Sequence, residues 1–271
     1  MRSLSVIIPT HNEARNIAEC IESVAWADEV VVVDDFSDDG TTDIARAMGA
    51  RVLPHEFVTP AAQKNWALEQ ASHPWVLEVD ADERVTPALR YEIRTILTHD
   101  GPADGYLVPV RGQVLGRRMR FGAWWRERKL RLFRRDLAHF PERRVHEAAE
   151  VKGRVGLCRG AILHYSYCSL DDCFVKMRRY AEWGAQDWLD QGRRPSAVRM
   201  LLHGPARFAR DYIVKLGFLD GVPGLIQGLF DAWQVTAKEA KLWDLARLAA
   251  VTHSPGSGAE HAEDKHSPTD A

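Results

Sequence analysis

The residues with the clearest chemical potential form an acidic turn. The apolar stretch Trp75-Val-Leu-Glu-Val79 is followed at once by Asp80, Asp82 and Glu83, three carboxylates in four residues. Like charges so close repel one another, and a buried carboxylate is costly unless a cation meets it. Magnesium and manganese ions prefer carboxylate and phosphate oxygens. The spacing therefore predicts that Asp82, with Asp80 beside it, holds Mg²⁺ or Mn²⁺ together with the diphosphate of a substrate.

Two other apolar stretches also end in polar residues. The first, from Leu4, ends in Pro9-Thr10-His11-Asn12-Glu13, and the second, from Glu29, ends in Asp34-Asp35. Ligands of an open parallel sheet bind beyond the carboxyl ends of its strands, so three polar strand ends predict one shared pocket. The chain has no Gly-x-Gly-x-x-Gly after the first stretch and no P-loop motif, which disfavours a dinucleotide or P-loop site.

The elements that must position these residues alternate between strand and helix. Strands are expected at 4–9, 29–34, 51–53 and 75–79, and helices at 17–24, 41–48, 61–71 and 87–97. This alternation predicts an α/β fold whose mostly parallel sheet has helices on both faces over about the first 100 residues. Mixed strands and long loops are expected over 105–164, a helical region from Leu170 onward, and a disordered tail after Thr252.

Composition and charge indicate a globular protein with one basic segment. The 271 residues are 45% hydrophobic and 27% charged, with a formal net charge of −2. Between Arg111 and Arg144, however, twelve Lys or Arg face three acids. Such an excess predicts a phosphate group or an anionic surface as partner, with a merely solvated basic face as the alternative.

Cysteine usage and hydropathy bear on location. The four cysteines form no Cys-x-x-Cys pair, so we expect reduced thiols and a cytosolic protein. The first strand begins by Leu4, which leaves no room for a signal peptide, and no run approaches the ~20 apolar residues that span a bilayer.

The ordered motifs resemble glycosyltransferase family 2. They are Ser5-Val-Ile-Ile-Pro-Thr-His-Asn-Glu13, Val31-Val-Val-Asp-Asp35 with Ser37, Asp39, Gly40 and Thr41, and Leu77-Glu-Val-Asp-Ala-Asp-Glu83. Further segments resemble the subgroup that adds sugars to the lipopolysaccharide core: Ala62–Asn65, Gly122–Trp125, Leu130–Arg135, Val145–Glu147, Leu163–Tyr167 and Lys215–Gly221. The resemblance covers about residues 3 to 245. It implies a GT-A fold and a nucleotide-diphosphate sugar as donor, most simply a UDP-sugar.

The resemblance also implies roles on the donor side. The expected nucleotide-sugar residues are Pro9, Thr10, Asn12, Glu13, Asp34, Asp35, Lys64, Asp80 and Ala81, with Asp82 and Asp80 at the metal. Asn12 could instead cap the following helix, and Lys64 could instead be a solvated surface residue. Arg131 is expected to bind a donor or acceptor phosphate, since a guanidinium binds phosphate bidentately.

On the acceptor side the resemblance implies a carboxylate base. Glu147 is the first choice and Glu127 the second, and His146 would orient Glu147, touch the acceptor or serve a structural role. Trp124 and Trp125 could stack against a sugar ring or pack in the core. Trp125-Arg-Glu127 stands where relatives often have Tyr-Pro-Asp, and Gly122-Ala-Trp124 where Gly-Gly-Trp is usual, which puts the acceptor in doubt.

These expectations add up to an inverting transferase. It would move a hexose such as glucose to the lipopolysaccharide core or another lipid-linked glycan, at the cytoplasmic face of the inner membrane and with no nucleic-acid partner. Residues 1–168 would be catalytic (1–100 the nucleotide-sugar half, 101–168 the acceptor half), 169–250 a helical region that can associate with a membrane, and 251–271 a disordered tail. Within the helices we expect 207–219 to contact a membrane and the apolar stripe at 222–233 to pack on the catalytic domain.

Rival interpretations lack a motif. A sugar nucleotidyltransferase normally has a glycine-rich loop after the first strand, where this chain has Pro-Thr-His-Asn-Glu. A phosphatase built on Asp-x-Asp would favour Thr where Arg84 stands. A transferase for another cell-surface polysaccharide or lipid carrier stays open, as does a carbohydrate-binding module without catalysis.

Overall fold

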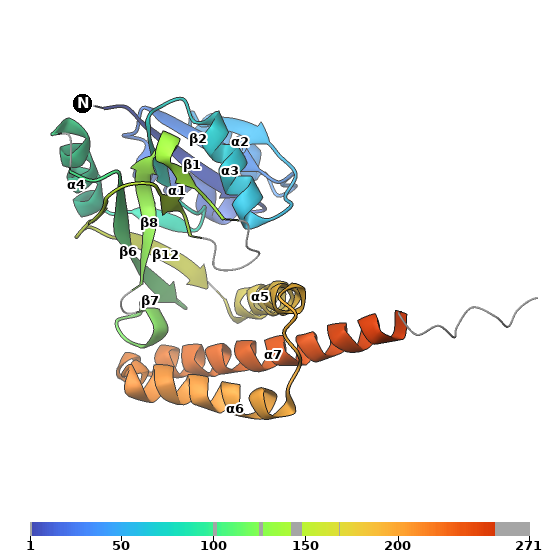
Figure 1. The fold of residues 1–271 in the computed structure, drawn as a ribbon. Coiled ribbons are helices and arrows are strands. Elements are labelled where there is room, and N and C mark those ends of the chain that lie inside the picture. The colour runs from blue at the N-terminus through green and yellow to red at the C-terminus, as the bar shows by residue number, and fades with distance from the viewer. Residues whose placement is uncertain (1, 100–101, 125–126, 142–147, 168, 253–271) are drawn as a thin grey trace, which may run out of the picture.

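The computed structural model describes residues 2–99, 102–124, 127–141, 148–167 and 169–252 (Figure 1). In chain order the elements are β1 (Leu4–Thr10), α1 (Ala14–Val24), β2 (Glu29–Asp34), α2 (Thr41–Ala47), β3 (Arg51–Pro54), α3 (Pro60–Gln70), β4 (Trp75–Glu78), β5 (Glu83–Val85), α4 (Pro87–Thr98), β6 (Gly105–Val114), β7 (Arg117–Arg118), η1 (Gly122–Trp124), β8 (Arg128–Arg134), η2 (Arg135–Leu137), β9 (Ala138–His139), β10 (Glu150–Val151), β11 (Val155–Leu157), β12 (Ile162–Tyr167), α5 (Leu170–Asp190), α6 (Ala197–Phe208), η3 (Ala209–Val214), η4 (Gly217–Asp220) and α7 (Val222–Thr252).

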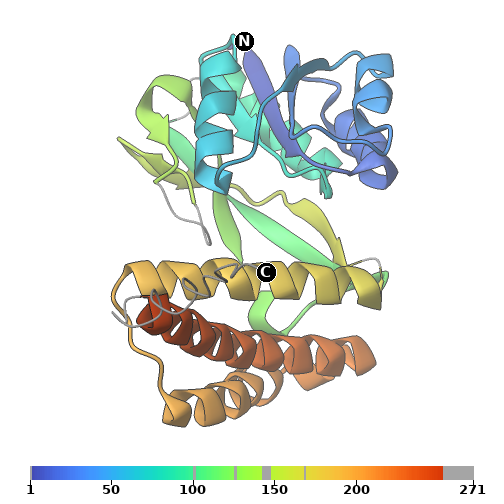
Figure 2. The same cartoon turned by 90° about the vertical axis from the view of Figure 1, so that its right-hand side faces the viewer.

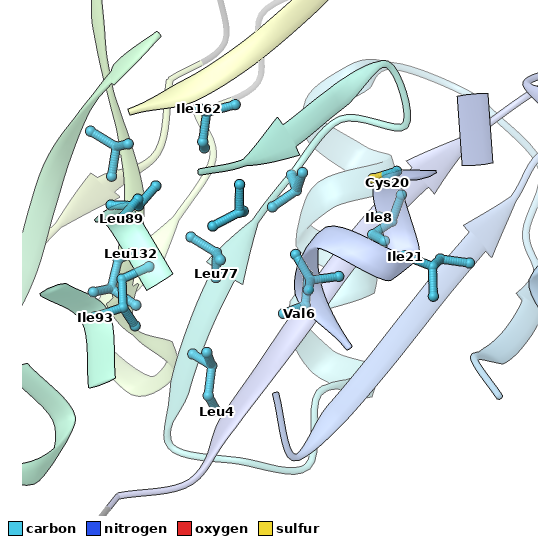
Figure 3. Packing of buried hydrophobic residues seen from close by; sticks show 14 of the residues in the cluster. Leu4, Val6, Ile8, Cys20, Ile21, Leu77, Leu89, Ile93, Leu132 and Ile162 are labelled. Carbon is cyan, nitrogen blue, oxygen red and sulfur yellow. The ribbon is translucent and has the colours of Figure 1, made fainter. Parts of the chain in front are cut away.

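The first half of the sheet is parallel, as the alternation predicted. Its strand order is β3-β2-β1-β4, and all three pairings are parallel. Side chains of β1 alternate between two cores. Val6 and Ile8 belong to one core, with Cys20 and Ile21 of α1 and Ile93 of α4 (Figure 3). Ile7 packs on the other face with residues of α3. The sheet is therefore covered by helices on both faces.

Beyond β4 the sheet becomes mixed and curls. It continues through β8, β6 and β12 to β5, with β8 antiparallel to both of its neighbours. Only residues 79–82 separate β4 from β5, although three strands lie between them in the sheet order. The sheet must therefore bend back so that the acidic turn can connect β4, in the middle of the strand order, to β5 at its end. The sequence did not predict β5, because a three-residue strand leaves no periodicity.

The C-terminal helices form a separate layer. Figures 1 and 2 show the order of this layer: α5 is nearest the sheet, α7 comes next, and α6 is farthest from the sheet. The expected packing of the 222–233 stripe is wrong for most of its members, since Val222, Leu225, Leu229 and Trp233 are exposed. Within the described residues, no helix combines the length and the hydropathy needed to cross a membrane.

The described cysteines agree with the expected thiols. Cys20, Cys158 and Cys173 are free and buried, and Cys168 lies outside the described residues.

One buried acid of the helical layer makes stability depend on pH. Burial raises the pKa of Asp231 from its ordinary value of 3.8 to about 6, even though Arg207 lowers it. The buried position favours the neutral carboxyl over the charged one. The contribution of Asp231 to the free energy of unfolding is therefore fully present below pH 4 and is lost as the pH rises through about 6.

We expect Asp231→Asn, which mimics the neutral form, to stabilise the protein at pH 8 by on the order of 1–3 kcal/mol and to have a much smaller effect at pH 4, close to the ordinary pKa of 3.8. Urea denaturation at both pH values measures this. Asp244→Asn on the exposed side of α7 is the matched control. An equal effect of Asp231→Asn at both pH values would contradict the assignment.

Candidate active site

Asp82 lies in the acidic turn between two cationic side chains. Its Oδ1 is 3.2 Å from Nε2 of His164, and its Oδ2 accepts a hydrogen bond of 2.8 Å from Nζ of Lys176. The pairing of β5 with β12 brings these groups together, because His164 pairs with Glu83 and the amide of Tyr165 donates to the Asp82 carbonyl. A strand, a turn and helix α5 thus converge on one carboxylate.

Asp80 belongs to a second, more deeply buried cluster around Arg131 of β8. Nη2 of Arg131 donates to Asp80 at 2.8 Å and to Glu83 at 2.7 Å, and Nη1 is ion-paired with Glu78. Lys64 of α3 adds a second cation, 2.8 Å from Glu78 and 3.6 Å from Asp80. Arg131 is 1% exposed while Asp80 keeps 30% of its side chain exposed, so Asp80 is the member of this cluster that faces solvent.

These contacts decide the charge of both aspartates. Burial alone would raise the pKa of Asp82, but His164 and Lys176 hold it below its usual range. Burial likewise opposes ionisation of Asp80, and Arg131 followed by Lys64 lowers its pKa well below the ordinary value. Burial lowers and Asp82 raises the pKa of His164, with a net rise. Both aspartates are therefore carboxylates at neutral pH.

The ends of β1 and β2 are joined by a small polar network. Asp34 accepts hydrogen bonds from the amide and the hydroxyl of Ser37, at 2.9 and 2.6 Å. The Asn12 amide donates to the same hydroxyl at 2.8 Å, and its Oδ1 accepts from the amide of Asp38. Helix α1 has Glu13 at its N-cap and no side-chain cap, so the capping interpretation of Asn12 is wrong.

Thr10 and Asp35 lie at the same edge of the sheet. Thr10 is buried, and its hydroxyl has no hydrogen-bond partner among the described residues. Asp35 accepts from the Phe57 amide at 3.0 Å and lies 3.4 Å from His11. A buried hydroxyl without a partner is costly unless a ligand or a water meets it, which suits a ligand pocket.

The remaining residues predicted for the donor side are also near this edge. Glu13 accepts from Asn16 at 2.6 Å, and burial raises its pKa. Pro9 is half-buried at the end of β1, and Ala81 is buried in the acidic turn. Lys64 is 8% exposed, so its interpretation as a solvated surface residue is wrong. Its donor contact stays a prediction, as do those of Pro9, Glu13 and Ala81.

Arg131 differs from its expected role in one respect. Its guanidinium faces carboxylates and is almost fully buried, so here it neutralises the acidic turn. A direct contact to phosphate stays a prediction.

On the acceptor side the structure describes Trp124 and Glu127. The Trp124 ring stacks on His164 with centroids 5.9 Å apart and packs against Gly112, where any Cβ would clash with it. Glu127 is 38% exposed, and its Oε1 lies 3.7 Å from Nζ of Lys129. Trp125, His146 and Glu147 lie outside the described residues.

The residues placed side by side to hold a divalent ion are Asp82 and His164, and the metal contact expected of Asp80, which pairs with Arg131, stays a prediction. A carboxylate oxygen and an imidazole nitrogen are both ordinary ligands of such ions, and these two are already within 3.2 Å of each other. In the described ranges no three His, Cys, Asp or Glu side chains meet in a way that could hold a metal. The pair therefore fits an ion only if a substrate's phosphate oxygens complete its coordination, as is common for magnesium.

Sequence reasoning did not assign His164 or Lys176. His164 belongs to the recognised motif Leu163-His-Tyr-Ser-Tyr167, but only its pairing with the unpredicted β5 brings it to Asp82. Lys176 reaches the site from α5, and nothing in the surrounding helical sequence marks it.

The chain was compared with known proteins. Residues 5–148 match the family model of glycosyl transferase family 2. A lipopolysaccharide core biosynthesis glycosyltransferase, LpsC of Rhizobium meliloti (strain 1021), is 30% identical over 254 residues, 91% of this chain and 94% of that protein.

The chain belongs to glycosyltransferase family 2.

Its curled α/β sheet with a C-terminal helical region is accordingly a GT-A fold, and the protein is a glycosyltransferase. The uncharacterized glycosyltransferase RP128 of Rickettsia prowazekii (strain Madrid E) is 29% identical over 263 residues, 91% of this chain and 88% of that protein. Among solved structures, S. aureus TarS 1–349 in complex with UDP has a TM-score of 0.44 and 21% identity, covering 91% of this chain and 92% of that one.

Removing the buried guanidinium of Arg131 should leave negative charge in the acidic turn without its counter-ion. We expect Arg131→Met to lower the free energy of unfolding by about 3–5 kcal/mol, because Glu78 and Glu83 lose their counter-ion in the interior. Urea denaturation measures the loss.

Arg134→Met on the same strand is the control. Its guanidinium pairs with Asp136 at the surface, so its loss should cost less than about 1 kcal/mol. Equal stability of the Arg131 and Arg134 variants would contradict the role given to Arg131.

Proposed function

We propose that this glycosyltransferase moves a hexose such as glucose from a UDP-sugar to the lipopolysaccharide core or another lipid-linked glycan, with inversion at the anomeric carbon. The observation that carries the proposal is the convergence of Asp82 and His164 at the edge of the sheet that also bears Thr10 and Asp35. Carboxylate and imidazole can meet a metal-bound diphosphate there, while the strand ends of β1 and β2 meet the nucleoside.

The donor side follows from the polar network. Thr10 offers an unpartnered buried hydroxyl for the nucleoside, and Asp34 and Asn12 keep the loop at Ser37 in place beside it. Asp80, partly exposed, would accept a hydrogen bond from the ribose. Lys64 and Arg131 keep Asp80 ionised for that role.

A divalent ion, Mg²⁺ or Mn²⁺, would be held by Asp82 and His164. Bound there with the donor diphosphate, such an ion supplies charge neutralisation for the departing diphosphate. Lys176 shares Asp82 with His164 in this structure, and its ammonium, beside the same carboxylate, would be available to bind a phosphate of the donor.

The transfer itself is a single displacement. The acceptor hydroxyl loses its proton to a carboxylate base, its oxygen bonds to the anomeric carbon, and the bond from that carbon to the diphosphate oxygen breaks, releasing UDP. Attack opposite to the leaving group inverts the configuration.

Glu127 is the better supported base. Its Oε1 lies 3.7 Å from Nζ of Lys129 at the start of β8. The charge of Lys129 contributes, after Arg131 and Lys64, to the lowered pKa of Asp80, so Glu127 lies on the side of the acidic turn. Glu147, the first choice from sequence, remains the other candidate, with His146 as its neighbour.

The proposal for the acceptor rests on the charged and aromatic residues of the chain and on its similarity to LpsC. The basic segment 111–144 suits phosphate groups, either of a core oligosaccharide or of an anionic surface, and Trp124 and Trp125 suit stacking on sugars of the acceptor. LpsC, a relative over nearly its whole length, is described as a lipopolysaccharide core biosynthesis enzyme. We propose that residues 1–168 are catalytic and that 169–250 hold the enzyme peripherally at the cytoplasmic face of the inner membrane.

The first test concerns donor and metal. With Mn²⁺ and a panel of nucleotide sugars, we expect the purified protein to hydrolyse a UDP-sugar slowly and to transfer it faster when core oligosaccharide is present. Asp82→Asn should lower turnover at least about a hundredfold with the fold intact.

Asp43→Asn, an exposed change on α2, is its control. If the protein neither binds nor hydrolyses any sugar nucleotide of the panel, the proposed transfer reaction is wrong. Formation of a nucleotide sugar from a sugar phosphate would indicate a nucleotidyltransferase instead.

The second test separates the two glutamates. We expect Glu127→Gln to lower kcat by about a thousandfold and to leave donor affinity unchanged, because an amide cannot take the proton. Glu147→Gln is the matched variant. If only Glu147→Gln lowers kcat, then Glu147 and not Glu127 is the base.

A further inference from the structure

Helix α6 turns an apolar face to solvent. Its exposed residues are Ala197, Val198, Leu201, Leu202, Pro205 and Ala206, and none of them is polar. Val198 is 63% exposed, Leu201 73% and Leu202 60%. An ordinary surface helix presents charged residues on this side and buries the apolar ones.

The polar side chains of α6 point inward instead. Arg199 and His203 lie 3.0 and 3.3 Å from the carboxylate of Glu239, which is fully buried on α7. One turn further, Arg207 is ion-paired with Asp211, which is 2% exposed. The fully buried positions of α6, η3 and η4 are Gly204, Asp211, Gly217 and Asp220, none with an apolar side chain. The polarity of this part of the layer is therefore inverted.

The exposed apolar side chains continue beyond α6. We define the apolar surface as the side chains of Val198, Leu201, Leu202, Ile213, Val214, Leu216, Phe218, Leu219 and Val222, all exposed. Between residues 197 and 222 the only exposed charged residues are Arg210 and Lys215, and both lie 3.0 Å from Asp211. No acid is exposed in this segment. Apolar areas of this extent on a protein surface mark interaction sites.

A basic hairpin borders the apolar surface. Arg117, Arg118 and Arg120 are exposed in the segment that includes β7. Asp220 of η4 fixes this hairpin by accepting hydrogen bonds from the amides of Arg120 and Phe121, at 3.0 and 2.9 Å. A Cβ at Gly221 would lie 3.7 Å from the Arg117 guanidinium, so the arginines adjoin Val222 and the end of the apolar surface.

The layer order sets the direction of this face. Because α6 is the outermost layer, with α7 and α5 between it and the sheet, its exposed side points away from the catalytic sheet (Figures 1 and 2). A flat partner bound there would leave the acidic turn open on the other side of the helices.

We propose that the apolar surface inserts into the interfacial region of an anionic phospholipid bilayer, with Arg117, Arg118 and Arg120 on the lipid phosphates. This inference specifies the docking surface and rests on the proposed peripheral location of the enzyme. Charge complementarity favours lipid over a second copy of the chain, since the same face on another copy exposes no acid for the three arginines. Uncharged apolar side chains beside basic ones are the pattern of in-plane membrane helices.

Vesicle flotation tests the proposal on the full chain. The wild type should float with phosphatidylcholine vesicles that contain phosphatidylglycerol, and Leu201→Ser with Leu202→Ser should lower the partition coefficient at least about tenfold. Arg117→Gln with Arg118→Gln should remove most of the dependence on phosphatidylglycerol. The control is Val155→Ser with Leu157→Ser, two exposed apolar side chains on β11, which should leave flotation unchanged.

A second measurement needs no variant. Hydrogen exchange of the wild type with and without the same vesicles should slow within residues 197–222 and not in β11. Unchanged flotation of the leucine variant, or no slowing within 197–222, would overturn the proposal. The proposal would also be overturned if the wild type is a dimer that does not float and the leucine variant is a monomer, because the apolar surface would then be a dimer interface.

Activity on a soluble acceptor separates this inference from the proposed function. The leucine variant should keep that activity while losing flotation. Flotation through this surface without any use of sugar nucleotides would refute the transferase proposal and leave the docking surface standing.

Discussion

The chain places four carboxylates within six residues, and their charge must be balanced inside the protein. Glu78, Asp80, Asp82 and Glu83 all lie in or beside the turn from β4 to β5. Arg131 and Lys64 balance three of them, while His164 and Lys176 meet Asp82. The cations come from α3, β8, β12 and α5, so this balance links two strands of the curled sheet to α3 and to the first C-terminal helix. The donor site depends on that arrangement.

The two aspartates have different surroundings, and the difference suits different tasks. Asp80 is paired with Arg131 and Lys64, two cations that it shares with Glu78, and their charges keep it ionised. Asp82 is held by His164 and Lys176, an imidazole that can itself bind a metal and a flexible ammonium that can move away. A carboxylate kept ionised by partners that can exchange suits the divalent ion that we propose for this site.

The sequence predicts the parallel half of the sheet well because long apolar strands and capped helices carry their own signals. All eight elements expected in residues 4–97 are present, each within a few residues of its expected bounds. It also predicts Asp80, Asp82 and the polar strand ends, since these follow strands directly. It misses His164 and Lys176, whose positions depend on the pairing of β12 with β5 and on the packing of α5. Periodicity within a segment contains no information on such long-range contacts.

The helical region fails the prediction in an informative way. An apolar stripe in a helix ordinarily marks the side that packs on the rest of the protein, and on that basis 222–233 was expected to be covered. In the structure Glu239, Asp211 and Gln227 are buried while leucines are exposed. Sequence periodicity identifies the two sides of a helix, but it does not tell which of them faces the rest of the protein.

The most direct test of the account is a crystal structure with Mn²⁺ and UDP, with the metal located by its anomalous scattering. The account predicts the manganese peak at coordination distance from both Asp82 and His164, with diphosphate oxygens completing the shell and the Lys176 ammonium moved off Asp82. Manganese bound elsewhere, with Asp82 still held by His164 and Lys176, would contradict it.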